Sequence, residues 1–294
     1  MACYRFYQID VFTETPLGGN PLAVFPEAEG LDPVQMQAIA REMNLSETTF
    51  VFPPEKPGGP VPVRIFTPRR EIPFAGHPVL GTADVLRAIR SATESSEKSL
   101  VLGLPSGPVP VVWREGIPFM DQPPATFQNP FPLVYRLGEA LGLPQSAIHT
   151  WWPAQVGSNG FTALLVPLQG LKQVESVQLN LTVLGEILGE VAMVYVFSLE
   201  TRDPECQVHA RAFAPALGIP EDPATGSAAG ILGTYLALHE VIDASLYPAV
   251  QIEQGLEMER PSRLQVKVEK LGDRVGSVQV GGKTRLVIEG TLNL

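Results

Sequence analysis

A helical segment without charged residues places the strongest constraint on how this chain folds. Residues 227–239 contain no Asp, Glu, Lys or Arg. A helix that is apolar on all sides must be buried on all sides. The segment is also too short to cross a bilayer, which takes roughly 20 residues. We therefore predict that this helix runs through the middle of a domain.

The first half of the chain contains a similar arrangement. Residues 78–90 are predicted to form a helix with a wide apolar arc, and they follow the turn Phe74-Ala75-Gly76-His77-Pro78. The uncharged helix follows a comparable turn, Glu221-Asp222-Pro223-Ala224-Thr225-Gly226. An Ile-Pro pair precedes each turn, half a chain length apart. The repeated order predicts an α/β (α+β) protein of two similar domains, each with a sheet wrapped around a central helix.

A proline-rich stretch, residues 122–132, separates the two halves. It carries few regular signals, so we place a domain boundary nearby. We assign residues 1–118 to an N-terminal domain, completed by the C-terminal strand 284–294, and residues 119–283 to a C-terminal domain. Alternation and β-branched residues predict strands at 4–12, 22–25, 49–52, 61–66, 100–104, 109–113, 161–166, 193–197, 207–213, 250–253, 264–269, 275–280 and 285–289.

The best-marked element is a helix that begins after Asp32. Asp32 is a favourable N-cap, Pro33 suits the first helical position, and Gln35 completes a capping box. Asn44 tolerates the left-handed conformation that ends a helix. A strand follows, so Ser46 and Glu47 are predicted to lie at a helix-to-strand junction, where side chains reach clefts.

Composition and charge exclude several classes of function. The net charge is −10 and the basic residues form no long run, which argues against nucleic acid and against an anionic membrane surface as partners. The two cysteines, Cys3 and Cys206, cannot form a disulfide framework, and the N-terminus has no apolar signal core. The expectation is a soluble, cytoplasmic protein.

The two turns and one carboxylate suggest the chemistry. The first backbone N–H groups of a helix have no internal partner, so two glycine-bearing helix N-termini could hold the carboxylate of a small ligand. Burial raises the pKa of a carboxyl toward the range of general acid–base catalysis, which is the hypothesis for Glu47. Asp222, His77 and Ser227 are further candidates. The alternative interpretation is structural: turns begin helices, Glu47 is a solvated loop carboxylate, Asp222 and Ser227 cap helices, and His77 packs in its turn.

Familiar cofactor and metal signatures are missing from the sequence. There is no phosphate-binding loop, no Gly-x-Gly-x-x-Gly after a strand and no Gly-x-Ser-x-Gly elbow. The four histidines are widely spaced and form no metal pair. These features predict acid–base chemistry without a cofactor and without a metal.

Several motifs together resemble those of the phenazine-biosynthesis isomerase-like (PhzF-like) family. The similarity lies in Gly19-Asn20-Pro21, Met36 through Phe50 with Asn44-Leu45-Ser46-Glu47-Thr48, Phe66-Thr67-Pro68, Ala75-Gly76-His77-Pro78, Phe213-Ala214-Pro215, Glu221-Asp222-Pro223-Ala224-Thr225-Gly226-Ser227-Ala228, Gln254-Gly255 and Arg260-Pro261-Ser262. The Ser-Glu-Thr and Asp-Pro-Ala-Thr-Gly-Ser signatures are specific in combination, and the matches span nearly the whole chain.

The resemblance implies the diaminopimelate-epimerase-like fold, in which two similar domains each form a curved, mostly antiparallel sheet around a central helix, with the active site between them. It also implies a cofactor-free homodimer that acts on a small carboxylate substrate. The family's namesake isomerises trans-2,3-dihydro-3-hydroxyanthranilate by moving a proton between two carbons. By this resemblance Glu47 is the acid/base, and His77 and Asp222 orient or polarise the substrate. Contacts to the substrate then come from the residues Asn20, Ser46, Gly76, Gly226 and Ser227.

Two features of the sequence differ from related proteins, and alternative functions stay open. Related racemases place a cysteine at each helix N-terminus, but here Cys3 and Cys206 lie in neither motif, which disfavours a two-thiol racemase. Glu259 stands where a glycine commonly precedes the family's Arg-Pro-Ser. The alternatives are a non-catalytic member that binds a small ligand or a protein, and an epimerase that uses carboxylates instead of thiols.

Overall fold

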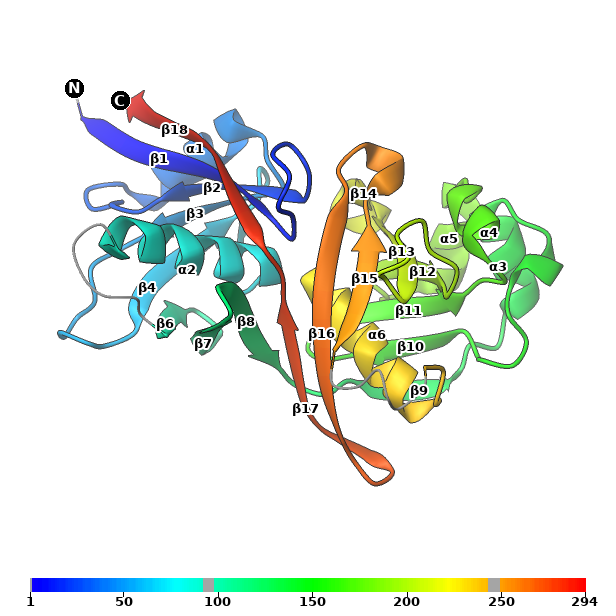
Figure 1. The fold of residues 1–294 in the computed structure, drawn as a ribbon. Helices are drawn as coiled ribbons and strands as arrows, with labels where there is room; N and C mark the ends of the chain where they lie inside the picture. The colour runs from blue at the N-terminus through cyan, green and yellow to red at the C-terminus, as the bar shows by residue number, and fades with distance from the viewer. Residues whose placement is uncertain (1, 92–97, 243–248) are drawn as a thin grey trace. The chain divides into compact units, whose positions relative to one another are not determined.

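The computed structural model describes residues 2–91, 98–242 and 249–294 (Figure 1). The chain forms two compact units: Met1–Asp121 with Gly281–Leu294 (unit 1), and Gln122–Val280 (unit 2). Both units are mixed α/β structures built on sheets with parallel and antiparallel pairs. That part of the fold prediction is confirmed, whereas the proposed repetition of one domain stays a prediction.

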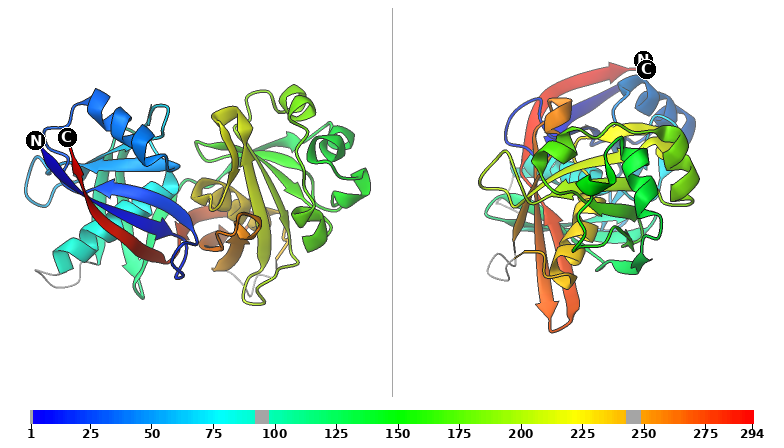
Figure 2. Two further views of the ribbon diagram at one scale, coloured as in Figure 1. Left: turned by 90° about the horizontal axis from the view of Figure 1, so that it is seen from above. Right: turned by 90° about the vertical axis from the view of Figure 1, so that its right-hand side faces the viewer.

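The sheet of unit 1 runs in the order β18–β1–β2–β3–β4–β6–β7–β8, and the short β5 also pairs with β4. The pairs β2–β3 and β4–β6 are parallel and the others are antiparallel. Strand β18 extends along β1, so the two termini lie side by side in every view (Figures 1 and 2). The strands are β1 Cys3–Val11, β2 Asn20–Phe25, β3 Glu47–Val51, β4 Val61–Phe66, β5 Glu71–Ile72, β6 Ser99–Leu104, β7 Gly107–Arg114, β8 Ile117–Gln122 and β18 Thr284–Asn293.

Two helices pack on unit 1's sheet. Helix α1, Pro33–Met43, has the expected capping box, because Gln35 N donates to Asp32 Oδ1 and Asp32 N donates to Gln35 Oε1. Helix α2, Gly76–Ser91, is in contact with strands β1, β2, β3, β6, β7 and β18. A Cβ at Gly81 would lie 2.8 Å from the side chains of both Leu22 and Val11, so glycine permits this close approach of helix to sheet.

The sheet of unit 2 runs in the order β9–β10–β11–β12–β13–β15–β16, and the short β14 also pairs with β13. The pairs β11–β12 and β13–β15 are parallel. The strands of this unit are β9 Thr126–Pro130, β10 Gln155–Ser158, β11 Thr162–Pro167, β12 Met193–Ser198, β13 Val208–Ala214, β14 Ile219–Asp222, β15 Val250–Gln254, β16 Ser262–Leu271 and β17 Arg274–Gly281.

The uncharged helix is α6, Gly226–Leu238, and it is buried along almost its whole length, as predicted. It packs on strands β10, β11 and β16, and Cβ atoms at Gly157 and Gly233 would meet Ile231 and Val266 at 2.5 and 2.4 Å. A separate apolar cluster joins helices α3 and α5 to β11 and β12. The remaining helices of unit 2 are α3 Val134–Leu141, α4 Leu171–Glu175, α5 Leu181–Leu188 and the 3₁₀ turns η1 Gln145–Ala147, η2 Pro215–Leu217 and η4 Leu256–Met258.

The region of residues 122–132 is more regular than its prolines suggest. It contains β9, which pairs only with β10 among the described strands. An edge strand tolerates proline because one side of its backbone needs no ladder hydrogen bonds. None of the described helices is long and apolar enough to span a membrane.

Candidate active site

The register of unit 1's sheet places the side chain of Glu47 on the face that α2 covers. Glu47 pairs with Leu22 on the parallel strand β2, and the Leu22 side chain lies against Gly81 of α2. Successive side chains of a strand alternate between its faces. Accordingly Thr49 lies on the same face as Glu47 and reaches Thr82 of α2 at 2.8 Å. Glu47, two residues earlier on β3, faces the first turn of the same helix.

Glu47 and His77 meet at that point. Glu47 Oε2 lies 3.3 Å from His77 Nε2, and the residues are 8% and 6% exposed. Burial lowers the pKa of His77 to about 3, so the imidazole is neutral at physiological pH. A neutral imidazole nitrogen either donates a hydrogen bond or accepts one. The pair can therefore accommodate both states of a carboxyl that gains and loses a proton.

The structure places the other candidates of unit 1 near the same elements. Gly76 is the first residue of α2 and is buried. Ser46 is half-buried immediately before β3. Asn20 is fully buried and begins β2, two residues before the partner of Glu47. Its alternation with Leu22 places Asn20 on the face of β2 that α2 covers.

The candidates of unit 2 gather at the start of α6. Asp222 ends β14, and Gly226 and Ser227 are the first residues of α6. Thr225 is the N-cap residue, but its hydroxyl does not cap the helix and instead donates to Asp222 Oδ2 at 2.5 Å. The carboxylate of Asp222 thus accepts a hydrogen bond from the threonine of its own turn.

Sequence reasoning missed the residues that support this turn. Gln254, the last residue of β15, donates from Nε2 to Asp222 O at 2.7 Å. Gln122 donates to Gly226 O at 3.2 Å, and Asn159 donates to Ser227 O at 3.1 Å. The Gln254-Gly255 motif was visible in the sequence, but the partners of Gln254 were not, since hydrogen bonds between distant residues leave no local pattern.

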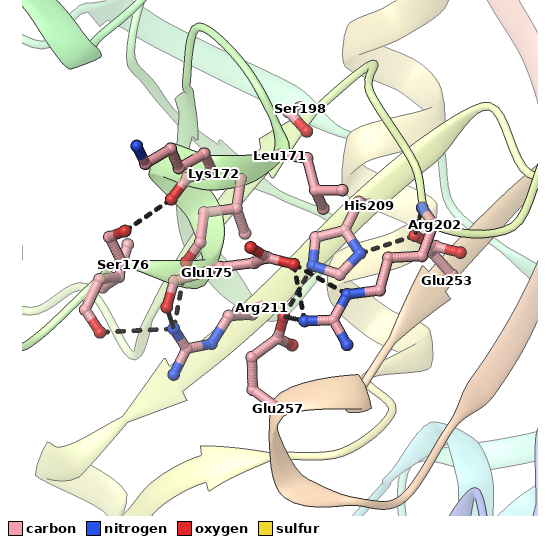
Figure 3. Close-up of polar contacts among 12 residues, drawn as sticks. Leu171, Lys172, Glu175, Ser176, Ser198, Arg202, His209, Arg211, Glu253 and Glu257 are labelled. Carbon is pink, nitrogen blue, oxygen red and sulfur yellow. Dashed lines mark hydrogen bonds and ion pairs between the residues drawn. The ribbon is translucent and has the colours of Figure 1, made fainter.

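A charged network lies on the face of β15 opposite to Gln254 in unit 2 (Figure 3). His209 of β13 is fully buried, with Nδ1 2.7 Å from Glu253 and Nε2 3.1 Å from Glu257. Arg202 lies beside it and pairs with Glu175 at 2.6 Å. Two carboxylates facing both ring nitrogens favour the doubly protonated imidazolium, which donates to each. This network holds β15 and η4, the segment that carries Gln254.

Replacing His209 with Gln is expected to destabilise the protein more at pH 5.5 than at pH 8.5. Burial alone lowers the pKa of His209, but hydrogen bonds and attraction to Glu253 and Glu257 outweigh it, so the pKa is raised above 6.5. A group with a raised pKa contributes its full stability below its unfolded value and loses that contribution as pH rises through the folded value. Charged hydrogen bonds of this kind contribute roughly 1.5–3 kcal/mol each.

The measurement for His209 is urea unfolding of wild type and variant at the two pH values. Burial alone raises the pKa of Glu257, but contact with His209 outweighs it, so the pKa is lowered. The stability that the pair contributes is therefore complete only above the ordinary titration range of Glu. That condition holds at both chosen pH values. A stability loss that is equal at the two pH values, or larger at pH 8.5, would show that the His209 charge is not what stabilises the network.

The described residues, 2–91, 98–242 and 249–294, contain no group of three or more His, Cys, Asp or Glu side chains arranged to hold a metal ion. Each unit has its own acid–base groups: Glu47 with His77 in unit 1, and Asp222 with Thr225 in unit 2.

Comparisons with known proteins cover the whole chain. A family model described as phenazine biosynthesis-like protein matches residues 9–290. The trans-2,3-dihydro-3-hydroxyanthranilate isomerase of Pseudomonas aeruginosa is 38% identical over 292 residues, covering 98% of each chain. A PhzF-family phenazine biosynthesis protein of Bacillus anthracis matches in structure with a TM-score of 0.89 at 28% identity, over 100% of both chains. A hydroxyproline epimerase of Agrobacterium vitis shares the fold, with a TM-score of 0.62 at 12% identity over 99% of this chain and 91% of the epimerase.

Proposed function

Because the chain belongs to the phenazine biosynthesis-like protein family and is an isomerase of that family, we propose that it moves a proton on a small cyclic or unsaturated carboxylate. The substrate class is similar to trans-2,3-dihydro-3-hydroxyanthranilate, the compound named for the Pseudomonas aeruginosa relative. No cofactor takes part in the proposed reaction.

The observation that carries the proposal is the pairing of Glu47 with His77. A buried carboxyl 3.3 Å from a buried imidazole is a costly arrangement for a protein that needs only a stable turn. Strongly perturbed ionisable groups concentrate at functional sites, and burial holds the pKa of His77 far below its ordinary value. The arrangement suits a carboxyl that must exist in both protonation states during one reaction cycle.

In the proposed reaction the Glu47 carboxylate removes a proton from a saturated carbon beside a double bond. The electron pair shifts along the conjugated system, and the Glu47 acid then returns the proton to a second carbon. An enol formed in this way becomes a ketone, and atoms are neither gained nor lost. His77, as a neutral imidazole, and Asp222 orient or polarise the substrate. Contacts to the substrate come from Asn20, Ser46, Gly76, Gly226 and Ser227.

Two broader features belong to the same proposal. The units correspond to two similar diaminopimelate-epimerase-like domains, residues 1–118 with 284–294 and residues 119–283, each with a sheet around a central helix. Helices α2 and α6, which each pack against several strands of their own unit, support this idea. The active protein is proposed to be a homodimer in the cytoplasm. Light scattering of the purified protein tests the oligomeric state.

A substrate panel tests the proposed function. Wild-type protein is incubated with trans-2,3-dihydro-3-hydroxyanthranilate and other small unsaturated carboxylates, and proton NMR follows the signals of each compound. Proline, hydroxyproline and common amino acids are followed by polarimetry. Formation of a product of unchanged mass with a shifted double bond supports the proposal. Ligand binding without conversion supports a non-catalytic role instead, and a change in optical rotation supports an epimerase.

A further inference from the structure

A chain of hydrogen bonds runs from the core of unit 2 to Asp222. The Tyr195 hydroxyl on β12 lies 2.9 Å from Gln254 Oε1. Gln254 Nε2 lies 3.1 Å from Thr225 Oγ1, and Thr225 Oγ1 lies 2.5 Å from Asp222 Oδ2. Tyr195 and Gln254 are fully buried, and Asp222 and Thr225 are nearly so. Buried polar groups in folded proteins are hydrogen-bonded, and the bonds made by these groups lead to the carboxyl of Asp222.

Two backbone groups settle the direction of the bonds that Gln254 makes. The Thr225 N–H, which can only donate, faces Gln254 Oε1 at 3.3 Å. The Asp222 carbonyl, which can only accept, faces Gln254 Nε2 at 2.7 Å. The amide orientation of Gln254 is therefore fixed by its partners rather than assigned by choice. Tyr195 must then donate to Oε1, and Thr225 Oγ1 must accept from Nε2.

The last bond of the chain reaches Asp222. Thr225 Oγ1 accepts from Gln254 Nε2 and donates its own hydrogen to Asp222 Oδ2 at 2.5 Å. A hydrogen bond donated to a carboxylate stabilises its charged form. Each bond of the chain therefore has its donor on the side away from the Asp222 carboxylate and its acceptor on the side nearer to it. A proton on Asp222 Oδ2 would compete with the hydrogen that Thr225 donates.

We propose that Tyr195, Gln254 and Thr225 are positioning residues that keep Asp222 unprotonated, so that it accepts a hydrogen bond from the substrate while Glu47 carries the moving proton. The role of Asp222 toward the substrate rests on the proposed function. The protonation state of Asp222 in the free protein does not depend on that function. The two carboxyl groups named as catalytic candidates then have different tasks, which agrees with acid–base sites that separate the titrations of two carboxyls.

The groups around Asp222 are consistent with a negative charge on its carboxylate. Burial, followed by the nearby charge of Asp222, raises the pKa of Tyr195 well above its ordinary value, so this phenol stays a donor throughout the working range. The charged groups on adjacent strands have partners of their own: Arg211 of β13 pairs with Glu221 of β14 at 2.8 Å, and Glu253 of β15 pairs with His209 at 2.7 Å. Helix α6 contributes no charged side chain.

Gln254 is held in place from both sides. Its neighbour Glu253 points to the opposite face of β15 and binds His209 and the backbone N–H groups of Arg202 and Asp203 (Figure 3). The following residue, Gly255, has φ 77°, and a Cβ there would lie 2.5 Å from Pro223 O. The strand end thus packs directly on the Asp222 turn, and glycine at position 255 permits this close approach.

The test measures the Asp222 carboxyl directly. Protein labelled with ¹³C at aspartate is titrated by NMR, and the Asp222→Asn variant identifies the Asp222 signal. Thr225→Val removes the hydroxyl that faces Asp222, and Thr225→Ser retains it. Tyr195→Phe removes the first donor of the chain. Tyr235→Phe is the matched control, because the buried Tyr235 hydroxyl donates to Pro153 O at 2.8 Å and not to this chain.

Thr225→Val is expected to move the Asp222 titration midpoint upward by roughly one pH unit, since a hydrogen bond to a charged group is lost. The same variant is expected to move the acidic limb of the pH profile of kcat/KM in the same direction. Tyr195→Phe should give a smaller shift of the same sign, and Thr225→Ser and Tyr235→Phe should give almost none.

Three results would overturn the proposal. The first is an unchanged Asp222 midpoint in folded Thr225→Val protein. If that variant does not fold, the second is an unchanged midpoint in Tyr195→Phe. The third is a shifted midpoint with an unmoved acidic limb, which would mean that the Asp222 charge is not used in the reaction. Absence of any turnover by wild type would instead contradict the proposed function, because the NMR titration reports on the chain without substrate.

Discussion

Replacing Glu47 with Gln is expected to lower kcat by roughly 10²- to 10⁴-fold, the usual contribution of a general acid–base group. The amide has nearly the size and hydrogen-bonding reach of the carboxyl, so the buried position on β3 can still be filled. It cannot accept and return a proton, however. KM is expected to change far less than kcat, because the lost interaction belongs to the transition state.

The matched control is Glu289→Gln on β18 of the same unit. Glu289 is about half exposed and pairs with Arg5, so its substitution changes charge by the same amount without touching Glu47 or His77. Its kcat is expected to equal that of wild type. Wild-type kcat in folded Glu47→Gln protein would remove Glu47 from the acid–base role and leave the binding-protein alternative as the better account.

Replacing Arg211 with Met is expected to cost about 3–5 kcal/mol of unfolding free energy, the usual effect of removing one partner of a buried ion pair. The Arg211 guanidinium donates two bonds of 2.8 Å to Glu221. It also donates to the carbonyl oxygens of Val174, Glu175 and Val177 at 3.1–3.3 Å. Methionine fills similar space but removes the donor from the Glu221 carboxylate and from three carbonyl groups, of which Val174 O still accepts from Val177 N.

Urea unfolding of Arg211→Met beside Arg5→Met measures this effect. Arg5 also pairs with a glutamate, but both side chains are about half exposed, and such pairs contribute little. The unfolding midpoint of Arg5→Met is expected to stay close to that of wild type. Equal midpoints for the two variants would show that burial of the Arg211 pair does not matter. Since Glu221 precedes Asp222 on β14, a loss of stability here should also disturb the candidate site.

Local physical rules made part of this fold predictable. The capping box at Asp32 and the left-handed Asn44 bound α1 as expected, because caps act within a few residues. The absence of charge in α6 predicted its burial, because no side of that helix could face water. Strand β9 and helix α3 were missed. The prolines of the first are tolerated at a sheet edge, and the second, for which we predicted no helix, packs an apolar face into the core of unit 2.

The candidate site was predictable only in its residue types. Glu47, His77 and Asp222 stood out from their motifs, but the 3.3 Å approach of Glu47 to His77 depends on the register of β2 and β3 and on the packing of α2. The link from Tyr195 to Gln254 joins residues 59 positions apart, and that from Gln254 to Thr225 spans 29. Such contacts form when strands pair, and nothing in the local sequence around either residue indicates them.

One experiment tests the central claim, that Glu47 moves a proton on the substrate, most directly. Wild type and Glu47→Gln are incubated in D₂O with trans-2,3-dihydro-3-hydroxyanthranilate and the unsaturated carboxylates of the panel, and proton NMR follows the carbon-bound positions. The account predicts that solvent deuterium enters a compound with wild type and that Glu47→Gln slows this entry by roughly 10²-fold or more. Deuterium entry at the same rate with both proteins would contradict it.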